Sequence, residues 1–465
     1  ENGMCHHGGC GPGYRLTLWI HPFVILSGSI PGAMPCGCIC RGTRERPFWE
    51  WNIWISRRSK VLTVFTRPED IIAKSEANAS ALFGCRTFYS TEGSSQCIRA
   101  MLNLVQLHAG QNGRRPRIAA GRNAHKTFLT AAALLDLDVD WLYPKDHTDY
   151  LSCCLTAEDI SDYLDQAKEK PAAVYLTNPD YLGNMVDVAA IADVCHQNGV
   201  LLVVDNAHGA YLKFLPESQH PVDLGADLCC DSAHKTLPVL TGGAYLHLSK
   251  ESAALFGTQA KHAMAIFGST SPSYLILQSL DRANVYLNTY RGTLVPFLKQ
   301  VHALKEKLQG YGYILSGNEP LKITVAAKSC GHTGTALAEI LARQGLVPEF
   351  ADSDYLVMMV TPETGREGLD RLETVLMQIP KREVLPAQAP ALRPAVQAMS
   401  IREAMLSCSE VVPVSESLGR ILAVPTVGCP PAVPIVACGE RIDRDAVEAF
   451  AYYGITRCAV VDDME

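Results

Sequence analysis

The sequence predicts an α/β fold in which helices cover a mostly parallel sheet. From about Arg67 onward, short apolar runs alternate with amphipathic segments of helical period. Polar residues follow several of these runs, at the edge where open parallel sheets bind ligands. A chain of 465 residues exceeds one hydrophobic core. We therefore expect a large sheet domain, a smaller α+β domain and a C-terminal α+β module.

One strand–helix–strand unit is clear. Ala172–Leu176 reads as a buried strand, and Asp187 as the N-cap of a helix that Gly199 ends. Val200–Val204 is then a second continuous apolar strand. Asp205 follows at its carboxyl end, so its side chain is predicted to face a ligand site.

Composition changes and a Pro/Ala-rich stretch divide the chain. A helical region at 273–310 links the large domain to two further strands and a helix, and 386–394 reads as a linker. The predicted parts are an aberrant segment at 1–66, a large domain at 67–310, a small domain at 311–380 and a C-terminal domain at 395–465.

Composition also narrows the function. The chain is 48% hydrophobic and 19% charged with a net charge of -7, which excludes a disordered tail and gives no basic surface for nucleic acid. The apolar run at 16–26 is too short and interrupted to span a membrane. A small-molecule enzyme is the better expectation.

The cysteines indicate a reducing compartment. Seventeen cysteines show no disulfide-framework spacing, and the pairs Cys153-Cys154 and Cys229-Cys230 lie in apolar stretches, where we expect them buried and reduced. A cytoplasmic location follows. Cys36, Cys38 and Cys40 alternate without a second ligand pair, so we expect no metal site.

Lys235 is the residue that indicates chemistry. It lies in Ser-Ala-His-Lys, after a short strand-like segment at 227–230 and before Thr241-Gly242-Gly243. A partly desolvated lysine amine can form a Schiff base with a carbonyl. Pyridoxal phosphate (PLP) chemistry needs such a lysine, an acid at the pyridine nitrogen and a phosphate cradle. Asp205 suits the second role, and Gly93-Ser94-Ser95 at a helix start suits the third.

Three neighbouring residues stay open on the sequence alone. His125 could lie against the cofactor ring or be a surface histidine at a helix start. Lys126 competes for the Schiff-base role, although its polar surroundings favour Lys235. His208 could be a core histidine or a partner of Asp205.

Five stretches together resemble one family. They are TEGSSQCIRAM at 91–101, GRNAHKT at 121–127, VVDNAHGA at 203–210, DSAHKTLPVLTGGAYLH at 231–247 and STSPSYLILQSLD at 269–281. With PPAVPIVACGERI at 430–442, they resemble the wing-less bacterial Orn/Lys/Arg decarboxylases, which are fold-type-I PLP enzymes.

The resemblance implies roles at matching positions. Lys235 would bond the cofactor, Asp205 would pair with the pyridine nitrogen, His125 would stack on the ring and Ala207 would pack beneath it. The residues implied near the cofactor are Gly93, Ser94, Ser95, His125, Asp205, Ala207, His208, Ser232, His234, Lys235, Thr270 and Ser271. The last two would approach from a neighbouring subunit, so a homodimer is implied. Asn206 stands where relatives usually carry Glu, with no core function expected to change.

The implied activity is decarboxylation of arginine, lysine or ornithine, which would feed polyamine synthesis. Two alternatives remain. The Asp205 and Lys235 arrangement is shared by fold-type-I aminotransferases and other PLP lyases. The altered N-terminal segment also allows a non-catalytic paralogue or a broken gene product.

The first 66 residues depart from the family. They carry seven Lys or Arg and three Glu with no Asp, a charge of +4 against -11 for the rest. The family motifs LHMPGHKG and LDITEIEGAD are missing. Back-translation shows that 38–46 can be encoded by DNA whose one-base-shifted frame reads LHMPGHKGK, and 49–65 by DNA whose neighbouring frame reads LGMEHLDITEVEGADSLY. We therefore hypothesise that at least 38–65 is a frame-shifted translation; the gene's nucleotides test this, because no recoverable HMPGHK would refute it.

Overall fold

The computed structural model describes residues 71–113, 116–145, 150–386, 389–390, 394–426 and 431–462. The segment predicted to be frame-shifted lies outside these residues. Within them, no helix is both long enough and apolar enough to cross a membrane.

The large domain is built on a seven-stranded sheet with the order β1-β7-β6-β5-β4-β2-β3. Its strands pair in parallel except β7, which runs antiparallel to β1 and β6, so the prediction of a mostly parallel sheet is confirmed. The strands are β1 Arg86–Ser90, β2 Arg117–Gly121, β3 Asp138–Leu142, β4 Ala173–Thr177, β5 Leu201–Asp205, β6 Leu228–Asp231 and β7 Ala244–Leu248.

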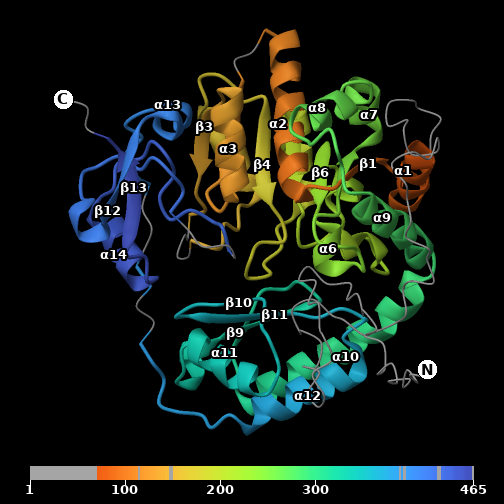
Figure 1. The fold of residues 1–465 in the computed structure, drawn as a ribbon, viewed down its shortest axis with the longest axis vertical. Helices are drawn as coiled ribbons and strands as arrows, with labels where there is room; N and C mark the ends of the chain where they lie inside the picture. The colour runs from red at the N-terminus through yellow and green to blue at the C-terminus, as the bar shows by residue number, and fades with distance from the viewer. Residues whose placement is uncertain are drawn as a thin grey trace, which may run out of the picture.

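Helices pack around this sheet (Figure 1). They are α1 Ile71–Phe83, α2 Gly93–Gln111, α3 Lys126–Leu135, α4 Ala157–Gln166, α5 Val188–Gln197, α6 Ala233–Thr236, α7 Lys250–Phe256 and α8 Ala260–Ile266. The predicted unit around α5 is correct, because the Asp187 side chain accepts a hydrogen bond from Ala190 N and Gly199 has a φ of 64°. Large apolar side chains such as Met101, Phe128 and Tyr175 fill the space between helices and sheet.

The predicted helical region consists of two helices, α9 Tyr274–Leu287 and α10 Tyr290–Tyr311. It leads to a four-stranded sheet with the order β10-β11-β9-β8, whose pairs are antiparallel. This sheet, drawn in teal, lies below the large domain in Figure 1. Its elements are β8 Leu315–Ser316, β9 Lys322–Ala326, α11 Gly334–Arg343, β10 Phe350–Ala351, β11 Tyr355–Met359 and α12 Gly365–Gln378.

The C-terminal module is drawn in blue at the side of the large domain (Figure 1). Its helices and strands are α13 Ile401–Leu406, β12 Ser409–Pro413, α14 Arg444–Tyr452 and β13 Arg457–Val461, with β12 and β13 antiparallel. Lys126 N donates to Ala432 O over 2.8 Å, and Arg402 Nη1 donates to Ala133 O over 2.8 Å. The module is thus held against both ends of α3.

One prediction about the cysteines was wrong. Cys153, Cys229 and Cys230 are buried, but Cys154 is exposed. Burial alternates along 151–155, so the extended chain directs Cys153 inward and its neighbour toward solvent.

Candidate active site

A cavity of about 610 Å³ lies at the carboxyl ends of β4, β5 and β6. All of the predicted site residues except Thr270 and Ser271 line it, namely Gly93, Ser94, Ser95, His125, Asp205, Ala207, His208, Ser232, His234 and Lys235. Lys126 lines it as well. The cavity therefore lies at the edge of the sheet where the sequence predicted a ligand site.

Asp205 ends β5 and is buried at the pocket wall. Ala207 N donates to its Oδ1 over 3.1 Å, and the Tyr175 hydroxyl donates to its Oδ2 over 3.3 Å. Burial raises the pKa of this carboxyl, while the charge of Lys235 opposes that rise. Both oxygens are oriented by the fold before any ligand binds.

Lys235 extends from the short helix α6, and its Nζ lies 2.9 Å from His208 Nε2. The other ring nitrogen of His208 lies 3.4 Å from Lys322 Nζ, which also donates to Asp180 O over 2.9 Å. The two ring nitrogens of His208 thus each face a lysine amine, Nε2 that of Lys235 and Nδ1 that of Lys322. His208 is thus a partner of Lys235, an option that the sequence had not raised.

Hydroxyl groups gather where α2 begins. Ser232 Oγ donates to Ser94 Oγ over 2.9 Å, and Ser95 Oγ lies 3.1 Å from Thr127 Oγ1. Gly93, with a φ of 71°, opens the helix in a conformation that other residues rarely adopt. The start of a 19-residue helix surrounded by hydroxyls is a suitable place for an anionic group.

His125 lines the pocket from the N-cap position of α3, as the first of the two alternatives requires. Its Nδ1 accepts from Thr127 N over 3.1 Å. Burial, together with the charges of Lys235 and Lys126, lowers its pKa to about 3. The ring is therefore neutral at pH 7 and can lie flat against an aromatic ligand.

Thr270 and Ser271 are exposed in the loop that joins α8 to α9. In this loop Ser271 N donates to Ser269 Oγ over 3.1 Å. Neither residue lines the cavity of its own chain. Their contribution to a neighbouring subunit stays a prediction.

The cavity also contains residues that sequence reasoning missed. Glu349 and Tyr181 line it, with the Tyr181 hydroxyl donating to Glu349 Oε1 over 3.2 Å. Arg99 lines it one turn of α2 beyond Ser95. The C-terminal module adds an apolar wall made of Met405, Val424, Pro425, Pro431 and Val433. No spacing in the sequence links these residues to Lys235, because they come from distant segments.

Two family models match the chain. The Orn/Lys/Arg decarboxylase major domain matches residues 52–311, and the Orn/Lys/Arg decarboxylase C-terminal domain matches 379–459. The chain belongs to the Orn/Lys/Arg decarboxylase family. The first match begins inside the segment predicted to be frame-shifted.

Curated relatives agree with this family. An arginine decarboxylase of Bacillus subtilis (strain 168) is 28% identical over 405 residues, which cover 82% of this chain and 80% of the relative. An arginine decarboxylase of Halalkalibacterium halodurans is 28% identical over 405 residues, covering 81% of this chain and 79% of the relative. The similarity thus extends over most of both proteins.

Solved structures show the same fold. Lysine decarboxylase A from Pseudomonas aeruginosa superposes with a TM-score of 0.68 at 16% identity, covering 85% of this chain and 71% of that chain. The Francisella novicida lysine decarboxylase LdcF gives a TM-score of 0.65 at 16% identity, covering 84% and 72%. The fold is that of fold-type-I PLP enzymes, and this Orn/Lys/Arg decarboxylase family member is a PLP-dependent decarboxylase.

The residues of the cavity fit PLP. Asp205 offers a fixed, buried carboxylate for a pyridine nitrogen, and Lys235 offers an amine for an aldehyde. Ser94, Ser95 and Ser232 offer hydroxyls at a helix start for a phosphate. The pyridine nitrogen, the aldehyde and the phosphate of the cofactor therefore each have a chemically matched partner on this chain.

Proposed function

We propose that this protein decarboxylates a basic amino acid, arginine, lysine or ornithine, to the corresponding amine and that the amine feeds polyamine synthesis. One observation supports the substrate class. Among the described residues that line the cavity, the carboxylates are those of Asp205 and Glu349. Asp205 is assigned to the cofactor, so Glu349 is left to bind the distal cation of a basic side chain.

Glu349 is suited to this role by its burial and orientation. Its side chain belongs to a residue only 8% exposed, directly before β10, and Tyr181 fixes one of its oxygens. A carboxylate with little water around it binds a cation more strongly than a solvated one. The pocket cations Arg99 and Lys126 lie beside Ser95 and His125, toward the end proposed for the phosphate.

The chain's own groups account for the remaining steps. Bound PLP supplies an aldehyde that condenses with amines and a ring that accepts the electron pair left by departing carbon dioxide. Asp205 holds a proton at the pyridine nitrogen, and the neutral ring of His125 keeps the cofactor plane in place. Lys235, whose Nζ lies 2.9 Å from His208 Nε2, is the amine that would bond the cofactor and give way to the substrate amine.

Product identification tests this proposal. Purified holoprotein, both as written and with residues 38–65 restored to the family frame, is incubated with each basic amino acid, and products are identified by mass spectrometry. We expect agmatine, cadaverine or putrescine. A keto acid formed only when a keto-acid acceptor is present would support the aminotransferase alternative. No product from the restored protein would support the non-catalytic alternative.

Replacing Glu349 tests the substrate class. In Glu349→Gln we expect KM for the preferred basic substrate to rise by roughly 10-fold to 100-fold, because a hydrogen-bonded charge pair of about 1.5–3 kcal/mol is lost. The value of kcat should change less, because this interaction is present before and during the reaction. Turnover of norleucine, which lacks the distal cation, is the control and should not fall. Equal losses for both substrates would contradict the role of Glu349.

Subunit arrangement, location and domain limits are part of the same proposal. We propose a homodimer in the cytoplasm, in which Thr270 and Ser271 of each chain reach the neighbouring site. Their exposure on the single chain is compatible with this. We keep the predicted division at 67–310, 311–380 and 395–465.

A further inference from the structure

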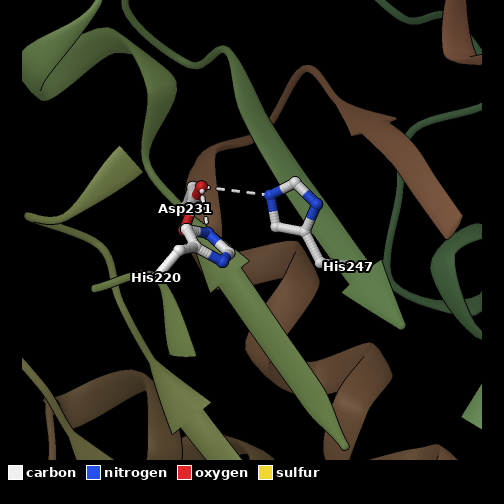
Figure 2. A group of neighbouring side chains, drawn as sticks. All are labelled: His220, Asp231 and His247. Atoms are coloured by element: carbon white, nitrogen blue, oxygen red, sulfur yellow. Dashed lines mark hydrogen bonds and ion pairs between the residues drawn. The ribbon is translucent and has the colours of Figure 1, made fainter. Parts of the chain in front are cut away.

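Asp231, the last residue of β6, lies between two histidines in the core of the large domain (Figure 2). His247 Nε2 is 3.0 Å from Asp231 Oδ2, and His220 Nε2 is 3.1 Å from the same oxygen. All three side chains are at most 1% exposed. Their polar atoms therefore have only each other and their immediate neighbours as partners.

This cluster joins the two chain segments that build the cofactor site. Asn206 Nδ2 donates to Asp231 Oδ1 over 2.7 Å, and Asn206 directly follows Asp205. Asp231 itself is directly followed by Ser232, which begins the segment ending at Lys235. The carboxylate thus bridges the ends of β5 and β6 immediately beneath the pocket.

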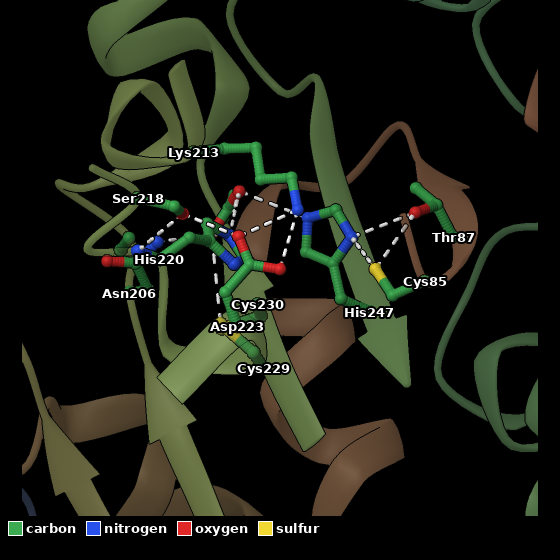
Figure 3. Close-up of polar contacts among 12 residues, drawn as sticks. Cys85, Thr87, Asn206, Lys213, Ser218, His220, Asp223, Cys229, Cys230 and His247 are labelled. Carbon is green, nitrogen blue, oxygen red and sulfur yellow. Dashed lines mark hydrogen bonds and ion pairs between the residues drawn. The ribbon is translucent and has the colours of Figure 1, made fainter. Parts of the chain in front are cut away.

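The connection continues to the strand that leads to α2. His247 Nδ1 is 2.9 Å from Thr87 Oγ1, and Cys85 Sγ lies 3.5 Å from the same nitrogen (Figure 3). Thr87 belongs to β1, whose end is followed by Gly93 and the hydroxyls proposed to bind phosphate. Side-chain hydrogen bonds therefore run across β5, β6, β7 and β1.

The hydrogen-bond pattern is that of a carboxylate satisfied by N–H donors. Asp231 accepts from Asn206, His220 and His247, and burial alone would raise its pKa, but these two imidazoles hold the pKa well below its usual range. Burial lowers the pKa of His247, whose neutral ring still donates through Nε2. The nearby cation Lys213 is paired with Asp223 at 2.6 Å.

The same three residues have the ligand types of a zinc site, and their ligand atoms lie within 4.8 Å of one another. One detail favours the hydrogen-bonded arrangement. His220 Nδ1 is buried without a hydrogen-bond partner in the described part of the chain. A metal-bound histidine normally donates its second ring N–H to an acceptor, and His220 Nδ1 has none among the described residues. If Nε2 instead carries the proton and donates it to Asp231, Nδ1 is unprotonated and no donor is left unsatisfied.

We propose that Asp231 is a positioning residue for the PLP site. It stabilises the site by fixing the segment that carries Asp205 relative to the segment Ser232–Lys235. In this arrangement hydrogen bonds from Asn206, His220 and His247 satisfy the carboxylate in place of a metal ion. The inference rests on the proposed cofactor contacts, so its readout is the binding of PLP to the apoprotein.

Asp231→Ala tests the proposal, with Asp227→Ala as the matched control. Asp227 directly precedes the opposite end of β6, where it accepts from a backbone amide of β5, Leu202 N at 2.8 Å, and lies 3.0 Å from His196 Nε2. Asp227 does not line the cavity. Each variant thus loses a buried carboxylate at one end of β6 that accepts a hydrogen bond from residue 202 or 206 of the neighbouring segment.

We expect Asp231→Ala to raise the dissociation constant for PLP by roughly 10-fold to 100-fold, as the loss of charged hydrogen bonds implies. Asp227→Ala should bind PLP within about threefold of the wild type, a difference of less than 1 kcal/mol. Induced circular dichroism of bound PLP should also change in the first variant only, because it reports ring orientation. A purely structural role would affect the unfolding temperature of both apoproteins but not this signal.

Asn206→Ala keeps the test valid if Asp231→Ala does not fold. It removes only the bridge to β5, and we expect PLP binding to weaken about fivefold, near 1 kcal/mol. Wild-type PLP affinity in either folded variant would overturn the proposal. One equivalent of zinc in the purified wild-type protein would also overturn it, in favour of a metal site. Failure of the wild type to bind PLP would instead refute the proposed cofactor site.

Discussion

The Lys235→Ala variant is expected to lose decarboxylation by at least roughly 10²–10⁴-fold, the range associated with a single proton-transfer group. In the proposed function Lys235 both bonds the cofactor and exchanges with the substrate amine, so its removal should affect binding and turnover together. The visible absorption of lysine-bound PLP should disappear as well. Carbon dioxide release and the absorption spectrum of reconstituted protein measure the two effects.

Lys126→Ala is the matched control, because Lys126 also lines the pocket and competed with Lys235 on sequence grounds. Its backbone N–H is bonded to Ala432 O, an interaction that the substitution keeps. We expect the absorption band to remain once PLP is saturating, with PLP affinity and turnover falling by no more than about tenfold, near 1.4 kcal/mol, because Lys126 lies toward the end proposed for the phosphate. If Lys126→Ala removed the absorption band and Lys235→Ala did not, the assignment of the lysine would be wrong.

Glu440→Gln is expected to destabilise the attachment of the C-terminal module by about 3–5 kcal/mol, because it leaves a buried guanidinium without its counter-charge. Arg122 Nη2 lies 3.2 Å from Glu440 Oε2, and the two side chains are 7% and 1% exposed. Arg122 also donates to the carbonyls of Pro434 and Ile435, each over 2.9 Å. Arg122 of the large domain therefore holds the module segment at 434–440, which directly follows Val433 of the pocket wall.

Hydrogen exchange of the amides in α14 and β13 measures this effect, since it reports opening of one part of a large protein. Loss of protection should be accompanied by a higher KM, because Pro431 and Val433 of the module line the cavity. Glu158→Gln, at the exposed pair with Lys145, is the control and should cause no measurable change. Unchanged exchange in Glu440→Gln would show that the ion pair does not hold the module.

The sequence was sufficient to predict the part of the site that is built from successive strands of the chain. Asp205 follows a strand whose apolar run is unbroken, and Lys235 follows the next strand, so both could be placed at one edge of a parallel sheet. The strand–helix–strand pattern was sufficient to predict the parallel sheet of the large domain, because the hydrophobic periodicity and the helix-capping residues indicated the same elements.

The remainder of the site depends on contacts between distant segments. Glu349 lies before a two-residue strand, and its approach to Tyr181 depends on how the small domain packs. His220 directly precedes a short 3₁₀ helix, and His247 lies within β7. No sequence motif marks either histidine as a neighbour of Asp231. Their proximity follows from strand order and not from spacing along the chain.

Carbon dioxide release from carboxyl-labelled substrates tests the central claim most directly. The frame-restored holoprotein is given labelled arginine, lysine and ornithine separately, without any keto acid, and trapped label is compared with the amine formed. We predict equal amounts of labelled carbon dioxide and amine from one of the three substrates. No label released from any of them, by protein that binds PLP, would contradict a decarboxylase of basic amino acids.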